Sequence, residues 1–154
     1  MAETIETRLK ALGITLPSAA APAANYVPFT RAGNLLFVSG QLPLKDGKLV
    51  STGLLGRDLD VAAGREAARQ CAINILAQAK AAAGSLDKVK SVLRISVLVA
   101  SAPDFTEQHL VGNGASDLLV EVLGDAGKHS RVAVGMAALP LNAAVEVESI
   151  LELH

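Results

Sequence analysis

The sequence predicts a single α+β domain, in which two long helices cover one face of a mixed β-sheet and a short helix precedes them. Two observations predict this class. The first is a series of short β-rich segments, separated by turn residues, up to residue 50. The second is a pair of long helical segments that alternate with further strands after residue 50. The 154 residues suit one domain, and a composition that is 51% hydrophobic and 19% charged excludes a disordered chain.

The chain is expected to begin with an extension, residues 1–24, ahead of the main domain at 25–154. Residues 3–12 are predicted to form a short amphipathic helix, and the segment 17–24, rich in Pro, Ala and Ser, is predicted to be a loop. The helix prediction rests on apolar residues at helical spacing, namely Ile5, Leu9 and Leu12.

A β-hairpin is predicted next. Residues 26–31 and 35–39 are rich in β-forming residues and flank a turn at 32–34 that contains Gly33-Asn34. Pro28 cannot donate a hydrogen bond to a neighbouring strand, so its strand is expected at the edge of the sheet. A second turn at 45–48 leads into a short strand at 49–50.

Residues 58–83 carry the strongest helical signal. Asp58 or Asp60 is a suitable N-terminal cap, and Gly84 is a suitable end. The expected buried stripe is Ala68, Cys71, Ala72, Ile75 and Ala79. Cys71 lies on that stripe and is interpreted as a packed small hydrophobe rather than a nucleophile.

A long strand at 90–100 and a second helix at 104–123 follow. The strand is expected to bury one alternating set of residues, Leu93, Ile95, Val97 and Val99. The helix is expected to start after Pro103 and to stop at Gly124, with an inner stripe of Phe105, Val111, Ala115, Leu118, Leu119 and Val122.

The last two predicted strands are 131–138 and 145–152. If they pair as a simple hairpin, Arg131 lies near Glu152 and Glu146 lies near Ala137. Arg131 and Glu146 are then roughly 15–20 Å apart along the sheet. Under that pairing the two side chains act together only if they come from different subunits.

Composition excludes several classes of function. A net charge of −1, 3% aromatic residues and the lack of a Lys/Arg run argue against a nucleic-acid partner. No apolar run reaches the ~18–20 residues of a membrane span, and the acidic start lacks the apolar core of a signal peptide. One cysteine permits no internal disulfide, and three scattered histidines predict no metal site and no cofactor. We expect a cytoplasmic protein.

Arg131 and Glu146 are the candidate functional pair. A guanidinium in an apolar strand is costly without a partner, so Arg131 is expected to meet a carboxylate of the protein or of a ligand. An ordinary salt bridge at an interface explains the same residue equally well. Glu146 and Glu148 share one face of their strand, so a solvated face explains one of them.

Four ordered motifs carry a resemblance to a known family. They are Asn25-Tyr26-Val27, Val38-Ser39-Gly40-Gln41, Val97-Leu98-Val99, and Arg131 through Leu139-Pro140 to Val145-Glu146-Val147-Glu148. In this order and spacing the chain resembles, over residues 25–153, the Rid family, also called YjgF/YER057c/UK114 and formerly endoribonuclease L-PSP. The residues 1–24 resemble an extension found in one branch of it.

The resemblance implies a chorismate-mutase-like fold and a homotrimer with clefts between subunits. It further implies hydrolysis of reactive imines or enamines, small carboxylate-bearing substrates, to 2-oxo acids and ammonia. Arg131 would then bind the substrate carboxylate and Glu146 would position water, with the cleft lined by Tyr26, Ser39, Gly40, Asn113 and Ala133. Two departures concern substrate choice: Ala133 stands where a small polar residue or cysteine is frequent, and His129-Ser130 replaces a frequent Pro-Ala.

The chemistry can also be judged from the residues alone. Imine hydrolysis needs a bound substrate, a positioned water and a proton route, for which Arg131 with Glu146 is a sufficient set, and the Gly40 amide can donate to a substrate oxygen. Tyr26 has an alternative role in core packing, with its hydroxyl at the rim. His129 is interpreted as part of a surface loop.

Three functions therefore stand side by side: an imine/enamine deaminase, a trimer that binds small carboxylates without turnover, and a ribonuclease. The last follows only from the older family name, and the charge and aromatic content disfavour it.

Overall fold

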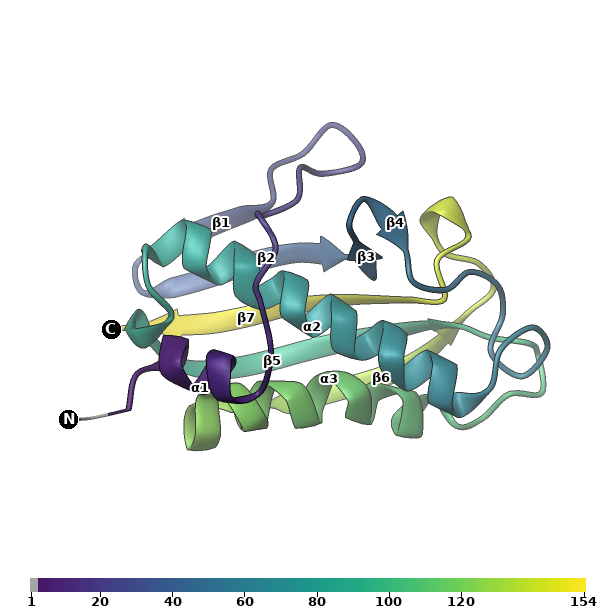
Figure 1. Cartoon of the computed structure of the whole chain (residues 1–154). Coiled ribbons are helices and arrows are strands. Elements are labelled where there is room, and N and C mark those ends of the chain that lie inside the picture. The colour runs from purple at the N-terminus through teal and green to yellow at the C-terminus, as the bar shows by residue number, and fades with distance from the viewer. Residues whose placement is uncertain (1–2) are drawn as a thin grey trace.

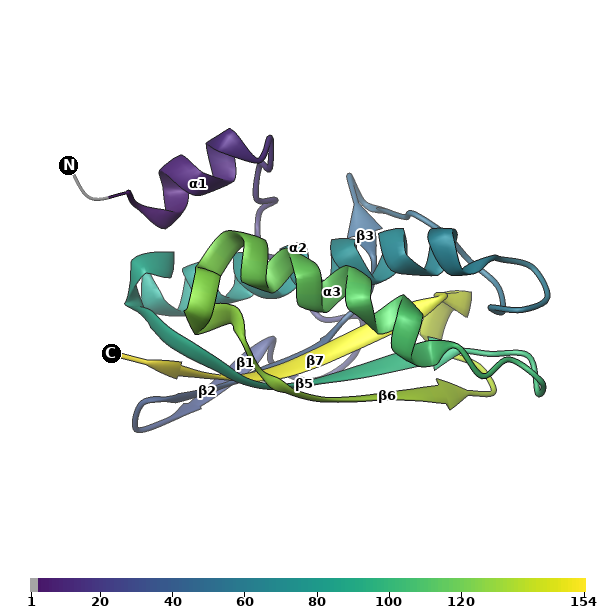
Figure 2. The ribbon, with the colours of Figure 1, turned by 90° about the horizontal axis from the view of Figure 1, so that it is seen from below.

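The computed structural model describes residues 3–154 and shows a five-stranded mixed sheet with its helices gathered on one face (Figures 1 and 2). Met1 and Ala2, the first residues of the predicted extension, lie outside the described residues. The helices are α1 (Ile5–Ala11), α2 (Val61–Ala83) and α3 (Gln108–Leu123). The strands of the sheet, in chain order, are β1 (Phe29–Ala32), β2 (Leu35–Gln41), β5 (Val89–Ala100), β6 (Ser130–Met136) and β7 (Val145–Leu153). The predicted α+β class is confirmed.

The spatial strand order is β1-β2-β7-β5-β6, with β1 and β6 at the edges. The β1–β2 hairpin is present where the sequence predicts it, and Pro28 lies just before the edge strand. Two short strands, β3 (Leu44–Lys45) and β4 (Lys48–Leu49), form a separate small hairpin. Short 3₁₀ turns at Leu86–Lys88, Gly124–Gly127 and Pro140–Asn142 complete the chain.

Helix α2 has the ends that its sequence predicts. The Asp60 side chain accepts a hydrogen bond from the Ala63 amide at 2.9 Å, and Gly84 closes the helix with φ of 85°. Cys71 is fully buried on the predicted stripe, and burial raises the pKa of its thiol well above the usual range. A thiol kept protonated in this way agrees with a packing role.

Helix α3 begins at Gln108 rather than at Asp104, so the predicted start is wrong. The Gln108 side-chain amide donates to the Phe105 carbonyl at 2.8 Å, which occupies an acceptor that a longer helix would use. Phe105 instead packs against the core from the preceding turn.

The prediction that Leu93 is buried is also wrong. The ladder between β5 and β7 shifts between Val92 and Arg94, so Val92 enters the core and Leu93 turns outward. Beyond this bulge the predicted alternation holds, and Ile95 and its alternate neighbours are buried.

The two last strands do not form a hairpin, which corrects the predicted pairing. Strand β5 lies between them, parallel to β6 and antiparallel to β7. The connection at 137–144 passes over the end of β5, where the Ala100 amide donates to the Ala144 carbonyl, and it is too long for a tight hairpin turn. Arg131 is therefore level with Ile95, and Glu146 is level with Leu98.

None of the helices within residues 3–154 covers the opposite face of the sheet (Figure 2). Large apolar side chains that are between 36% and 41% exposed lie along it: Leu35, Phe37, Leu93, Val132 and Val134. We call this surface the open face. It contrasts with the helical side, where α2, α3 and Leu9 of α1 bury the core.

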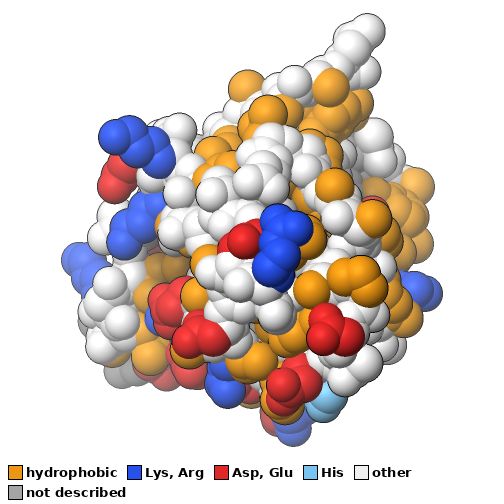
Figure 3. All heavy atoms as spheres, turned by 90° about the vertical axis from the view of Figure 1, so that its right-hand side faces the viewer, with side chains coloured by type: hydrophobic (Ala, Val, Ile, Leu, Met, Phe, Trp, Pro, Cys, Tyr) orange, Lys and Arg blue, Asp and Glu red, His pale blue; other side chains and the backbone are white. Residues whose placement is uncertain are grey.

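Charged side chains of both signs are interspersed among hydrophobic ones on the end of the molecule shown in Figure 3. A continuous basic surface is not visible on that face of the described residues. Across residues 3–154, none of the helices combines the length and apolar character that crossing a bilayer requires.

Helices α2 and α3 approach each other closely at Gly114. A Cβ there would collide with the Arg65 carbonyl oxygen of α2. We predict that Gly114→Ala lowers the free energy of unfolding by about 1–3 kcal/mol, because the helices must separate. Without this contact the same change would raise it by up to ~1 kcal/mol through helix propensity.

Urea denaturation measures that change. Val120→Ala, at an exposed position of the same helix, is the control and should alter the free energy of unfolding by less than about 0.5 kcal/mol. Stabilisation by Gly114→Ala would contradict the close approach.

Candidate functional site

Arg131 lies near the start of β6 and points toward α3, on the helical side of the sheet. Its Nη1 donates to Asn113 Oδ1 and to Ser116 Oγ, each at 3.1 Å, and its Nη2 donates to the His109 carbonyl at 3.0 Å. Gly112 leaves room for the guanidinium, because a Cβ there would lie 3.1 Å from Nη1. Arg131 and Asn113, both predicted as site residues, are therefore in direct contact.

Two N–H groups of Arg131 remain for a ligand. A guanidinium has five N–H donors, and the three hydrogen bonds above use both hydrogens of Nη1 and one of Nη2. The Nε and Nη2 nitrogens lie side by side along one edge of the guanidinium. That edge matches the two oxygens of a carboxylate.

All three acceptors around Arg131 are neutral. Among residues 3–154, no carboxylate lies within 4.0 Å of the guanidinium nitrogens. The charge is therefore positioned without being paired in this chain, which leaves an external carboxylate as the partner that the sequence predicts.

Ser116 and His129 extend this network; sequence reasoning missed Ser116 and interpreted His129 as part of a surface loop. Ser116 Oγ lies 2.8 Å from His129 Nε2, and His129 Nδ1 lies 2.6 Å from the Gly127 carbonyl oxygen. Ser116 follows Asn113 by one helical turn, a spacing that places both on the same face of α3. That spacing was the available signal, although nothing in the sequence shows that β6 lies beside this face.

Glu146 lies on the other side of the sheet, on the open face. It is half-buried beside Gly40 of β2, where a Cβ would overlap the Glu146 Oε1 atom. Burial raises the pKa of the Glu146 carboxyl above its ordinary value, and the negative charge of Glu148 raises it further. Glu146 is therefore suited to holding and releasing a proton closer to neutrality than an exposed glutamate.

The remaining predicted cleft residues divide between the two sides. Tyr26 and Gly40 line one small pocket of about 50 Å³, and the Ser39 hydroxyl donates to the Val27 carbonyl at 2.8 Å. Tyr26 is 48% exposed, so the alternative of core packing is wrong. Ala133 shares the α3-facing side of β6 with Arg131 and lies close to Gly112.

The structure thus contains two half-sites. The arginine half-site comprises Arg131, Asn113, Ser116, His129 and Ala133, and the glutamate half-site comprises Glu146, Gly40, Ser39 and Tyr26. Arg131 and Glu146 are offset by three residues across β5, or about 10 Å along the strands, and point to opposite faces. One chain cannot present both groups to one small substrate.

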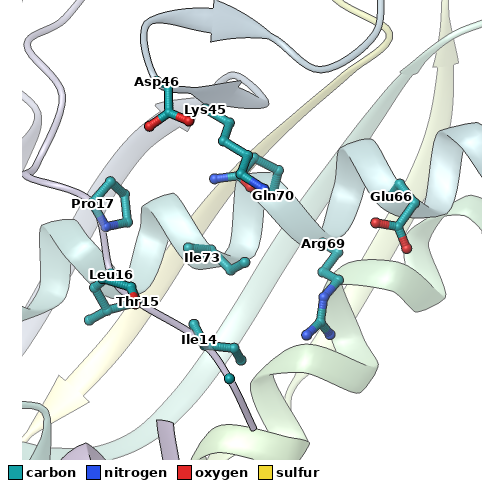
Figure 4. Close-up of a pocket in the computed structure, with 11 residues that line it drawn as sticks. Ile14, Thr15, Leu16, Pro17, Lys45, Asp46, Glu66, Arg69, Gln70 and Ile73 are labelled. Atoms are coloured by element: carbon teal, nitrogen blue, oxygen red, sulfur yellow. The ribbon is translucent and has the colours of Figure 1, made fainter. Parts of the chain in front are cut away.

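A larger cavity, of about 490 Å³, opens on the helical side between residues 13–17, α2 and the β3–β4 turn (Figure 4). Lys45 and Asp46 lie on one side of it, and Glu66 and Arg69 project from α2. None of the catalytic or cleft residues predicted from the sequence lines this cavity. Residues 3–154 also contain no group of three potential metal ligands.

Comparison with known proteins identifies relatives along almost the whole chain. Residues 6–153 match a family model described as "YjgF/chorismate_mutase-like, putative endoribonuclease". Protein TCP17 of Trypanosoma cruzi is 51% identical over 151 residues, which cover 97% of this chain and 94% of TCP17.

Two solved structures illustrate the likeness. Atu1372 of Agrobacterium tumefaciens, a protein of unknown function, has 59% identity and a TM-score of 0.91, covering 97% of this chain and 92% of its own. RidA of the Antarctic bacterium Psychrobacter sp. has 30% identity and a TM-score of 0.61, covering 90% of this chain and 98% of its own.

The electrostatic coupling of Glu146 to Glu148 is testable. We predict that Glu148→Gln lowers the pKa of the Glu146 carboxyl, because it removes a neighbouring negative charge. The pKa should stay above that of an exposed glutamate, since burial is the larger cause. Carbon-detected NMR titration of the side-chain carboxyl measures both values.

Glu152→Gln is the matched control, because Glu152 is on the same face of β7 but forms its ion pair with Lys90. It should leave the titration of Glu146 unchanged. An equal shift in both variants would argue against a specific Glu146–Glu148 coupling.

Proposed function

Because the chain belongs to the YjgF/chorismate mutase-like family, we propose that it hydrolyses small 2-imino acids, or their enamine tautomers, to 2-oxo acids and ammonia. One observation supports this proposal above all. Three neutral acceptors hold the Arg131 guanidinium, and its Nε–H and one Nη2 hydrogen remain for a substrate carboxylate.

The reaction needs no more than these groups can provide. Water adds to the imine carbon, a proton passes to the nitrogen, and the C–N bond breaks to release ammonia and leave a carbonyl. Glu146, with its raised pKa, takes the proton from the attacking water and returns it to the leaving amine. Arg131 holds the carboxylate, so that the imine carbon stays in one place while this happens.

The division into two half-sites supports an oligomer as the active form, and the family resemblance makes that oligomer a homotrimer. A cleft between subunits can combine the arginine half-site of one copy with the glutamate half-site of the next. The open face supports the same conclusion, since five large apolar side chains on it are more than a third exposed in the single chain.

A second candidate is a trimer that binds small carboxylates without turnover. Ala133 favours it, because a methyl group beside Arg131 can neither donate a proton nor hydrogen-bond to an intermediate. Both candidates use the same carboxylate contact, so only an assay of turnover separates them.

The principal prediction concerns Arg131. We expect Arg131→Ala to lower kcat/KM for a 2-imino acid by at least about 100-fold, the equivalent of about 2.7 kcal/mol of lost charge-assisted hydrogen bonding. The imine is generated in the cuvette by an amino-acid oxidase, and release of 2-oxo acid and ammonia is measured above the spontaneous rate.

Arg57→Ala is the control, because Arg57 forms a surface ion pair with Asp58 away from both half-sites. It should keep the wild-type rate. Wild-type protein that binds 2-oxobutyrate in calorimetry but never exceeds the spontaneous rate would favour the binding function instead. RNA cleavage by wild type that Arg131→Ala abolishes would favour a ribonuclease.

The assembly is predicted separately. Light scattering should give three times the chain mass of 15.8 kDa, and Val134→Asp on the open face should produce monomers with no turnover, since it buries a charge in the proposed interface. Val120→Asp, on the exposed side of α3, should stay trimeric. A wild-type monomer at micromolar concentration would contradict the cleft between subunits.

A further inference from the structure

We propose that His129 and Ser116 are positioning residues that hold the Arg131 guanidinium in the orientation in which it receives a carboxylate. The proposal rests on the proposed function for the nature of that ligand. It assigns a role to two side chains of the arginine half-site: Ser116 contacts Arg131 directly, and His129 acts on Arg131 through Ser116.

The hydrogen-bond directions follow from the acceptors. The Gly127 carbonyl can only accept, so His129 Nδ1 carries the proton of that 2.6 Å contact. In the neutral ring Nε2 is then the acceptor, and the Ser116 hydroxyl donates to it across 2.8 Å. With its hydrogen committed to His129, Ser116 Oγ presents a lone pair to Arg131 Nη1 at 3.1 Å.

Each hydrogen bond in this chain fixes one rotation or one tautomer, so that the next hydrogen bond has a partner with a defined orientation. A serine hydroxyl rotates freely unless its hydrogen has an acceptor, and an imidazole can swap tautomers unless one nitrogen is fixed. Here a backbone carbonyl fixes the ring, the ring fixes the hydroxyl, and the hydroxyl fixes one edge of the guanidinium. Asn113 alone would leave Nη1 with a single side-chain acceptor.

The position of His129 in the chain suits this role. It lies two residues before Arg131, immediately ahead of β6, and Ser116 lies on α3. The chain of hydrogen bonds therefore ties the start of the arginine strand to the helix that carries Asn113.

A purely structural role would be to attach the 127–129 segment to α3. The two roles differ in what they change. Loss of an attachment lowers stability and affects all substrates alike, whereas loss of positioning weakens carboxylate binding only through Arg131.

The test uses Ser116→Ala and His129→Ala, together with the conservative variants Ser116→Thr and His129→Gln. For each full-length variant we would measure kcat and KM for the 2-imino acid, and the Kd of 2-oxobutyrate by calorimetry. Thermal unfolding and light scattering verify the fold and the assembly. His154→Ala, a histidine at the end of the chain, is the matched control and should match wild type.

The expected result is a rise of about 10-fold in KM and in the 2-oxobutyrate Kd for both alanine variants, with kcat within about twofold. Ser116→Thr keeps a hydroxyl and His129→Gln keeps an acceptor, so both should recover most of the affinity. In an Arg131→Ala background, adding Ser116→Ala or His129→Ala should cause no further loss.

Unchanged KM and Kd in both alanine variants would overturn the proposal, as would a further loss of the same size in the Arg131→Ala background. Wild-type binding without turnover, with the variant pattern above, would support positioning and overturn the deaminase. A wild type that neither binds 2-oxobutyrate nor hydrolyses an imine would overturn both.

Discussion

The parallel pairing of β6 with β5 decides how Arg131 lies relative to Glu146. It places β5 between β6 and β7 and sets Arg131 level with Ile95, so that the arginine turns toward α3 while Glu146 turns to the open face. An antiparallel hairpin of β6 with β7 would instead have put both groups on neighbouring strands. The separation of the two half-sites, and hence the case for a second subunit, follows from this one pairing.

The two half-sites would be stabilised by ligand charges of opposite sign. Arg131 is a cation among neutral acceptors, whereas Glu146 is a carboxyl whose pKa is raised by burial and by a second carboxylate. Each is costly in the isolated chain and would be relieved by a group of the opposite sign. The proposed cleft provides that relief, with the substrate carboxylate facing the arginine and the developing positive charge of the imine nitrogen facing the glutamate.

Local patterns predicted most elements, and non-local contacts explain what they missed. Asp60 caps the N-terminus of α2 and Gly84 ends the helix, as the capping preferences of these residue types predict. The bulge that turns Leu93 outward, and the crossover that separates β6 from β7, depend on strands distant in the sequence, which no periodicity records. Arg131 could be named from its place in an apolar strand and Asn113 from the family resemblance, whereas the contacts of Ser116 and His129 became visible only when α3 was found beside β6.

Glycines explain how charged groups come to lie so close to the backbone. Because Gly112 has no Cβ, the Arg131 guanidinium can pack against the backbone of α3. Gly40 likewise leaves room for the Glu146 carboxyl against β2. Gly114, one residue beyond Asn113, lets α2 approach the other side of the same turn. Two glycines in one helix cost about 1 kcal/mol each in helix propensity. That cost is offset by the close packing of this turn against α2 and against Arg131 of β6. The packing holds Asn113 in place as an acceptor for Arg131.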